Sequence, residues 1–348
     1  MPKRVKQRSC PKNPKRHCPK RQCPKRQLQS SLHPLVRVPP MALAPFLRKR
    51  ELEVVRWVCK SLHPIYNEIL IKCKWWTEKQ YQRLSSTQQE MVRKLTSVVS
   101  VLKLPPYLTH LSLSKNMKLV FPSTLTWLIL EKHGPIFPGY LPPHLKTLVL
   151  QNYNHPLDQG CLPSNLTELR LYGDFNQPWE HFILPDTLTS LRLGCNFNPE
   201  ILPDHLPPHL TSLELYRWNH PLLSTVLPSC LQTLELFYFN QPLTHLPSSL
   251  RSLILGHYNH PLLQLPPLTE LLLNESFNSV VDFPTTLETL RLGSSYRLPF
   301  DGQRLVLLRH LSCCNHDVLT TFPPNLETMN GLPVDEWRKR FMPHEIKP

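Results

Sequence analysis

The sequence predicts an α+β protein in which a solenoid of short parallel strands forms most of the chain, with a small all-α domain and a disordered basic tail before it. Three observations support this: a block of about twenty residues that recurs from Leu104 onward, a stretch before it without this repeat, and a concentration of positive charge in the first 50 residues. We expect four parts: a basic tail (1–33), a helical domain with a linker helix (34–103), the repeats (104–331) and a C-terminal cap (332–348).

Each block reads Leu-Pro-x-x-Leu-x-x-Leu-x-Leu, followed by a short turn and an aromatic-Asn-x-Pro-Leu tail. In the copy LPSNLTELRLYGDFNQPW, Leu169 and Leu171 alternate with polar residues, which is the period of a half-buried strand. One copy buries too few apolar side chains to offset the entropy of ordering it, so the copies must stack. They begin at Leu104, Phe121, Leu141, Leu162, Leu184, Leu206, Leu227, Leu246, Leu265 and Phe283, with degenerate copies near Arg304 and Phe322.

The 39 Pro far outnumber the 9 Gly and lie in phase with the repeat. We therefore expect extended segments and short 3₁₀ turns, with few helices, on the outer side of the solenoid. The Asn of each tail is expected to satisfy backbone groups of the turn inside the coil, stacked from copy to copy; the alternative is contact with a ligand. These residues are Asn154, Asn176, Asn219, Asn240 and Asn259.

The aromatic-Asn-x-Pro-Leu signature resembles the FNIP repeat, a relative of the leucine-rich repeat that is expanded in social amoebae and giant DNA viruses. The resemblance covers residues 104 to about 330, and implies a leucine-rich-repeat-like solenoid that presents a recognition surface. The tail departs from the pattern at residues 197–200 and 277–280 and in the copies at Leu104, Phe121 and Arg304.

The segment LVRVPPMALAPFLRKRELEVVRWVCKSL, which starts at Leu35, is similar to the F-box. It departs from that pattern at Val36, where Pro is expected, and at Pro39 and Pro40. The resemblance implies docking on the Skp-type adaptor of a cullin-RING (SCF-type) ubiquitin ligase, and without it the same leucines would form the core of an end cap. The adaptor-binding residues that it implies are Leu43, Leu47, Leu52, Val58 and Cys59.

Two further segments have helical signals. Residues 77–80 (TEKQ) and 87–90 (TQQE) both read as capping boxes. Apolar residues then recur at helical spacing and predict a linker helix through Met91, Leu95, Val98 and Val99. At the other end, LPVDEWRKRFM predicts a short amphipathic helix with Asp335 as its cap, and with Trp337 and Phe341 against the last coil.

The positive charge is confined to the amino-terminal end. Residues 1–50 contain fifteen Lys and Arg and no acidic residue, so the rest of the chain balances at 25 of each sign. Pro and like charges predict that the tail is disordered, and residues 1–27 could serve nuclear import, nonspecific nucleic-acid binding or no specific role. No apolar stretch approaches the ~18 residues of a membrane span, and ten Cys without a framework favour free thiols in a reducing compartment. We therefore expect no membrane contact and a place in the cytoplasm or nucleus of a host cell.

Residues that alternate with the strand leucines should form the inner surface of the solenoid, where a protein target would bind. Aromatic and Arg side chains anchor protein interfaces, whereas stacked Arg and Glu can also simply compensate each other on a solvated face. The predicted target-binding residues are Arg170, Tyr172, Arg192, Glu214, Tyr216, Glu235 and Phe237.

We expect no enzymatic activity, cofactor or metal site. The His residues recur at fixed repeat positions (His144 with His209; His155 with His220 and His260), and Cys10, His17, Cys18 and Cys23 do not have zinc-site spacing. The sequence favours a substrate-recognition subunit of an SCF-type ligase. The alternatives are a ligase-independent scaffold or decoy binder, and a nucleic-acid-associated protein tethered by its tail.

Overall fold

The computed structural model describes residues 71–72, 74–99, 104–117 and 119–341. The chain divides into two units, Met1–Ile69 and Leu70–Pro348, and all described residues belong to the second unit. The basic tail and the implied adaptor-binding residues, Leu43, Leu47, Leu52, Val58 and Cys59, lie outside the described residues.

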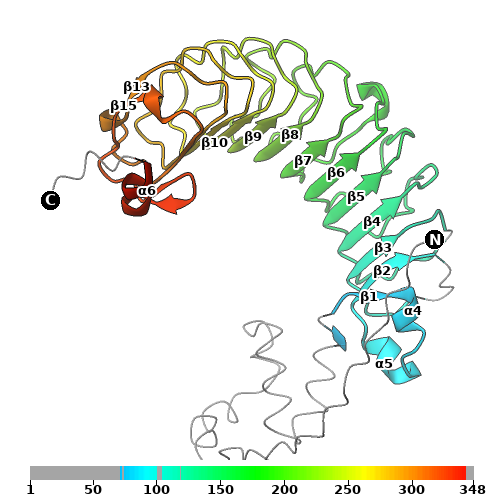
Figure 1. Ribbon diagram of the computed structural model, residues 1–348. Coiled ribbons are helices and arrows are strands. Elements are labelled where there is room, and N and C mark those ends of the chain that lie inside the picture. Colours follow the sequence, from blue (N-terminus) through cyan, green and yellow to red (C-terminus); the bar gives the residue numbers. More distant parts are fainter. Residues whose placement is uncertain (1–70, 73, 100–103, 118, 342–348) are drawn as a thin grey trace, which may run out of the picture. The chain divides into compact units, whose positions relative to one another are not determined.

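A fifteen-stranded sheet runs through the described unit, with the strands in chain order. All its pairs are parallel except β16 with β17, and the strands line the inner side of the curved solenoid (Figure 1). Its strands are β1 (Trp76–Thr77), β2 (Lys94–Val98), β3 (His110–Leu113), β4 (Trp127–Glu131), β5 (Thr147–Gln151), β6 (Glu168–Tyr172), β7 (Ser190–Leu193), β8 (Ser212–Leu215), β9 (Thr233–Leu236), β10 (Ser252–Leu255), β11 (Glu270–Leu273), β12 (Thr289–Leu292), β14 (His310–Cys313), β16 (Thr328–Met329) and β17 (Leu332–Pro333).

Helices are few and short in the described residues. The α-helices are α4 (Glu78–Tyr81), α5 (Ser86–Met91) and α6 (Val334–Phe341), and the 3₁₀ segments are η3 (Trp179–His181), η4 (Gly302–Arg304) and η5 (His316–Val318). A second, two-stranded sheet pairs β13 (Phe300–Asp301) with β15 (Leu319–Thr321). The predicted solenoid of short parallel strands with few helices is thus confirmed.

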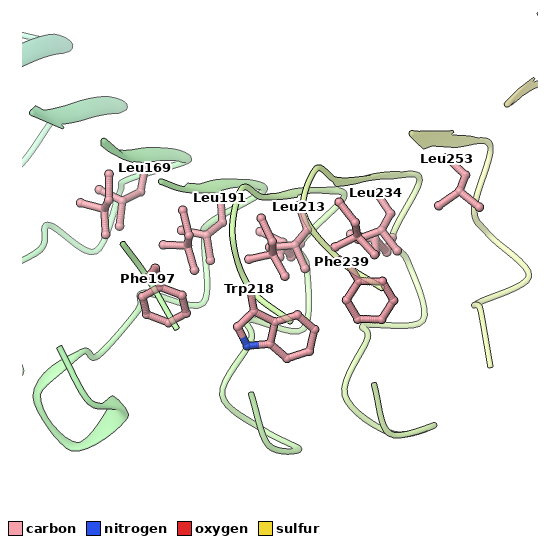
Figure 2. Packing of buried hydrophobic residues seen from close by; sticks show 14 of the residues in the cluster. Leu169, Leu191, Phe197, Leu213, Trp218, Leu234, Phe239 and Leu253 are labelled. Carbon is pink, nitrogen blue, oxygen red and sulfur yellow. The ribbon is translucent and has the colours of Figure 1, made fainter. Parts of the chain in front are cut away.

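The leucines of each strand point into the coil. Leu169, Leu191 and Leu213 are successive partners in the parallel register and are almost fully buried, as Figure 2 shows for the middle of the solenoid. The corner before each strand is a turn in which the backbone N–H of the next Leu donates to the carbonyl of the Pro, for example Leu166 to Pro163 at 3.0 Å. Because Pro only accepts in this bond, its missing N–H costs nothing here.

The aromatic residues of the repeat tails form a second buried row beneath the leucines. Phe197, Trp218 and Phe239 lie side by side in Figure 2. The rings of Trp218 and Phe239 are stacked with centroids 5.8 Å apart, and Phe239 stacks on Tyr258 at 6.2 Å. Each coil therefore packs on the next through both its leucines and its aromatic ring.

The Asn residues of the tails stack from copy to copy, as predicted. The side-chain Oδ1 of Asn219 accepts the backbone N–H of Asn240 at 2.8 Å, and Asn240 does the same for Asn259 at 2.9 Å. The predicted place inside the coil was wrong, because these Asn are exposed. The aromatic residue just before each Asn takes the buried position, so the Asn side chain is left on the rim of the turn.

The solenoid begins earlier than the leucine-proline repeat. The linker helix predicted through Met91, Leu95, Val98 and Val99 was wrong, because Lys94–Val98 is strand β2, which pairs with β3. Leu95 and Val98 are fully buried on it, but Ser97 has a φ of 54°, so a local irregularity shifts the register and breaks the alternation that marks a strand in sequence.

Of the two predicted capping boxes, one is present at the predicted residues and the other is displaced. The box from Thr77 to Gln80 is present at the start of α4. The second box lies two residues earlier than predicted: the side-chain oxygen of Ser85 accepts the N–H of Gln88, and the Gln88 side chain accepts the N–H of Ser85 at 3.0 Å. Thr87 is therefore inside α5 and does not cap it.

The predicted C-terminal helix is confirmed as α6. Trp337 is 2% exposed and packs against the Phe322 ring at 6.1 Å. Phe341 touches the Trp337 ring at 5.2 Å but is half exposed, so it covers the last coil only in part. Asp335 lies in the first turn of the helix, so the prediction that it is the cap was wrong. In that position its negative charge interacts favourably with the positive end of the helix dipole.

Candidate interaction face

The sheet register brings the charged target-binding residues predicted from sequence into one column. Arg170, Arg192, Glu214 and Glu235 are successive Cα partners on the adjacent strands β6 to β9. Their side chains lie on the side opposite the buried leucines, because neighbouring strand residues point to opposite faces. The column is therefore one continuous surface.

The aromatic members of the predicted set follow the same strands. Tyr172 ends β6, and Tyr216 and Phe237 come directly after β8 and β9. The pairing continues through them, because the N–H of Tyr216 donates to the carbonyl of Leu193 at 3.1 Å and that of Phe237 to Leu215 at 3.1 Å. All seven predicted residues thus lie together across four neighbouring coils.

The arginines of the column are compensated within the face. Arg170 pairs with Glu168 on its own strand, and Arg192 forms an ion pair with Glu214 on the next strand. Arg192 also donates from Nη1 to the hydroxyl of Tyr172 at 2.9 Å. Among the described residues, no ion pair involves Glu235, although it is the direct register partner of Glu214.

Glu214 is largely buried in the column, with its side chain 13% exposed, against 36% for its partner Arg192. Burial raises the pKa of its carboxyl above the usual range, and the neighbouring Glu235 raises it further, whereas Arg192 opposes the shift. The two adjacent carboxylates are therefore in an electrostatically unfavourable arrangement, which a further positive charge would relieve.

An exposed aromatic group lies beside the acidic pair. The Tyr216 ring contacts the rings of Phe237 at 5.3 Å and Tyr238 at 5.4 Å, and His257 stacks on Tyr238 at 4.4 Å. The guanidinium of Arg217 stands over the Tyr238 ring, 5.3 Å from its centroid. The sequence interpretation missed Tyr238, His257 and Arg217, because they follow the strand and fall outside its alternation.

A second aromatic group lies nearer the N-terminal end of the sheet, outside the four strands β6 to β9. Trp75 contacts Trp127 at 5.1 Å and His110 at 5.6 Å, with the Lys94 ammonium 5.9 Å from the Trp75 ring. His110 and Trp127 are register partners on β3 and β4. Sequence reasoning missed this group because Trp75 and Lys94 were assigned to the helical region.

The described residues contain no group of three or more His, Cys, Asp or Glu side chains that could hold a metal ion. Two of the recurrent His residues are scaffold: Nε2 of His220 lies 2.7 Å from the carbonyl of Asn198, and Nε2 of His260 lies 3.0 Å from that of Asn240. The cysteines of this part are free thiols: Cys161, Cys195, Cys230, Cys313 and Cys314. No helix in the described part of the chain is long and apolar enough to cross a membrane.

Comparison with known families identifies the repeat. The FNIP Repeat model matches residues 134–173, 153–196 and 197–238. The chain contains FNIP repeats. The matched FNIP repeats include all four strands of the interaction face, β6 to β9, and the model describes a repeat and no catalytic domain.

Solved structures similar to this chain are leucine-rich-repeat proteins. CroV588, reported as a novel circular LRR protein structure, is 26% identical over 70% of this chain, with a TM-score of 0.57; the match spans 45% of CroV588. YopM from Yersinia enterocolitica WA-314 is 19% identical over 70% of this chain and 62% of its own length, with a TM-score of 0.40. Among curated proteins there is no match. The likeness to CroV588 and the order of the parallel strands show a solenoid of leucine-rich-repeat type.

Proposed function

We propose that the exposed surface of strands β6 to β9, which we call the strand face, binds a segment of a protein target. We further propose that the chain is the substrate-recognition subunit of an SCF-type ubiquitin ligase. The observation that supports target binding is the continuous column on β6 to β9, in which charged and aromatic side chains stand next to one another. Solenoids of this kind use such extended inner surfaces for binding.

The size of the column suits an extended peptide segment. Parallel strands are ~4.8 Å apart, so the distance from Arg170 to Glu235 across three strand spacings is ~14 Å. An extended chain rises ~3.3 Å per residue, so about four residues of a target would span it. Tyr216 supplies an exposed ring of the type that anchors interfaces.

The ligase part of the proposal rests on the F-box-like segment. Leu47 and Leu52 take its central apolar positions, where the resemblance implies contact with a Skp-type adaptor. The chain would then act by holding its target close to a ubiquitin-transferring subunit, so the rate gain would come from proximity supplied in trans.

A binding assay with a purified Skp-type adaptor tests this part. We expect the full chain to bind, Leu52→Asp to lose binding, and Phe237→Ala, which changes only the strand face, to bind like the wild type. The urea unfolding transition of each variant shows whether the repeats remain folded. Absence of adaptor binding by the wild-type chain would contradict the ligase role and leave a ligase-independent repeat scaffold or decoy binder.

The third alternative, a nucleic-acid-associated protein, has its own signature. The eleven Lys and Arg of residues 1–27 would release counterions on binding, so the affinity for nucleic acid would fall steeply with salt. Deleting residues 1–27 would remove this dependence. A flat salt dependence would exclude binding through the tail.

A further inference from the structure

One surface of the strand face is chemically distinct from the rest. Two carboxylates and three aromatic rings meet on β8, β9 and the residues directly after them. We call this surface the acidic–aromatic patch, and it consists of Glu214, Tyr216, Glu235, Phe237 and Tyr238.

Of the two carboxylates of the patch, only Glu214 has an ion-pair partner among the described residues. Glu214 and Glu235 are direct partners on adjacent strands, an arrangement in which like charges destabilise a sheet. Arg192 pairs with Glu214 and is also held by the Tyr172 hydroxyl, so its position is fixed toward the N-terminal side of the patch. Glu235 lies on the other side of Glu214, away from Arg192, and the structure gives it no ion pair among the described residues.

The surroundings of Glu235 are apolar and aromatic. Its next register partner is Ile254 on β10, and the partner after that is Leu272 on β11, both half-buried. On the aromatic side, Tyr216 and Tyr238 are 38% and 39% exposed. Glu235 is thus a carboxylate placed between an apolar strip and exposed rings.

Gly256 keeps the end of this surface free of side chains. Its N–H donates to the carbonyl of Leu236 at 2.8 Å, so it occupies the position after Phe237 in the same column. A Cβ at Gly256 would collide with the backbone carbonyl of Phe237, so the close approach of the two coils requires glycine. The column therefore has no side chain next to Phe237 on the C-terminal side.

These features match the side chain of lysine or arginine. Its charged head would meet the Glu235 carboxylate and offset the repulsion from Glu214, while its aliphatic stem would lie on Ile254 and the rings. Arg217 stands over the ring of Tyr238, so this aromatic group already interacts with a cation within the chain. An acidic side chain would meet repulsion, and a neutral one would leave the excess charge uncompensated.

We propose that the acidic–aromatic patch binds a lysine or arginine side chain of an extended segment of the protein target. The proposal rests on the proposed function, in which the strand face holds such a segment, and it names the side chain that the face recognises. It therefore places a basic residue of the target opposite Glu235.

Small probes test the patch without knowledge of the target. The full chain, labelled with ¹³C in its Tyr rings, is titrated with N-acetyl-lysine methylamide, N-acetyl-arginine methylamide and, as the neutral control, N-acetyl-glutamine methylamide. We expect saturable shifts of the Tyr216 and Tyr238 signals with the two cations only. In Glu235→Gln, the dissociation constants should rise about fivefold or more.

A matched control separates the patch from the general field of the protein. Glu270→Gln removes the same charge from the same sheet face. Glu270 lies two strands away from Glu235, and its carboxylate accepts a hydrogen bond from the Ser252 hydroxyl. It should leave both cation affinities unchanged. Tyr216→Ala keeps both carboxylates and should weaken binding by removing a ring of the patch.

The proposal is overturned if no saturable shift appears, if the glutamine probe binds equally well, or if Glu235→Gln and Glu270→Gln have the same effect. None of these outcomes touches the proposed function, because a target segment could still occupy the strand face through Arg170 or the apolar strip. Conversely, if no target binds through the strand face, the lysine and arginine probes could still shift the Tyr signals. The two failures are therefore distinguishable.

Discussion

The side-chain Oδ1 of Asn176 accepts the backbone N–H of Asn198, one coil further along the chain, at 3.0 Å. The same bond joins Asn154 to Asn176 at 3.0 Å and Asn259 to Asn278 at 2.8 Å. The Asn of the repeat is therefore a connector between neighbouring coils that acts along the exposed rim, while the leucines and aromatic rings connect the same coils in the core.

Asn240→Ala tests this connector. It removes the acceptor for the N–H of Asn259, so the free energy of unfolding should fall by about 1 kcal/mol, and the Asn259 amide should exchange faster with solvent. Asn240→Asp keeps an acceptor oxygen and should cost less. Amide exchange measured by NMR checks both, and equal exchange rates in wild type and Asn240→Ala would contradict the connector role.

Phe239→Ala tests the aromatic row. The ring is fully buried between Trp218 and Tyr258, so we expect a loss of about 3–5 kcal/mol of stability in urea unfolding. Tyr238→Ala is the matched control, because it removes a neighbouring ring that is 39% exposed and should cost about 1 kcal/mol or less. Similar costs for the two variants would show that the row does not stabilise the coils.

The pKa of Glu214 reports on the charges of the column. Removing its repulsive neighbour with Glu235→Gln should lower this pKa, and removing its ion-pair partner with Arg192→Gln should raise it. Glu270→Gln should leave it unchanged. A ¹³C titration of the Glu carboxyls measures the shifts, and shifts of the same sign in the two neighbouring variants would refute the assigned causes.

The same carboxyl has a consequence for stability. Because burial raises the pKa of Glu214 in the folded chain, the folded state binds more protons than the unfolded state in the interval above the ordinary Glu pKa. The contribution of this group to stability therefore falls as pH rises through that interval. Glu214→Gln should remove this part of the pH dependence, which urea unfolding at a series of pH values measures; an unaltered profile would count against it.

Gly256→Ala tests the close approach of the coils beside Phe237. The added Cβ would meet the Phe237 backbone, so we expect a loss of about 3 kcal/mol. Gly139→Ala is the control: its Cβ would meet nothing within 4 Å, and only the strain of a φ of 75° remains, which costs roughly 1–2 kcal/mol. Thermal unfolding of both variants measures the difference, and a larger loss for Gly139→Ala would contradict the close approach.

The regular part of the fold could be predicted from sequence because each copy repeats the same physical constraints. The alternation of Leu169 and Leu171 with polar residues defines both the strand and its exposed face, and equal phase in successive copies fixes which residues become neighbours. The column from Arg170 to Glu235 followed from that phase alone.

The parts that could not be predicted lie where the repeat is interrupted. In β2, the left-handed Ser97 spoils the alternation, so the segment read as a helix. Tyr238 and His257 follow their strands, and only the three-dimensional stacking of the coils brings their rings into contact. The rim position of Asn240 depends on which residue of the tail takes the interior, and the aromatic neighbour decides this by its larger apolar surface.

Site-specific photo-crosslinking tests directly whether the strand face binds the target. A photoreactive phenylalanine analogue replaces either Tyr216 on the strand face or Phe137, an exposed aromatic residue outside the strands, in chains expressed in cells. We expect a discrete cross-linked protein from position 216 that is absent from position 137 and is lost when Arg170→Glu and Phe237→Ala are added. Equal cross-linking from both positions, or a product that persists in the face variant, would contradict it.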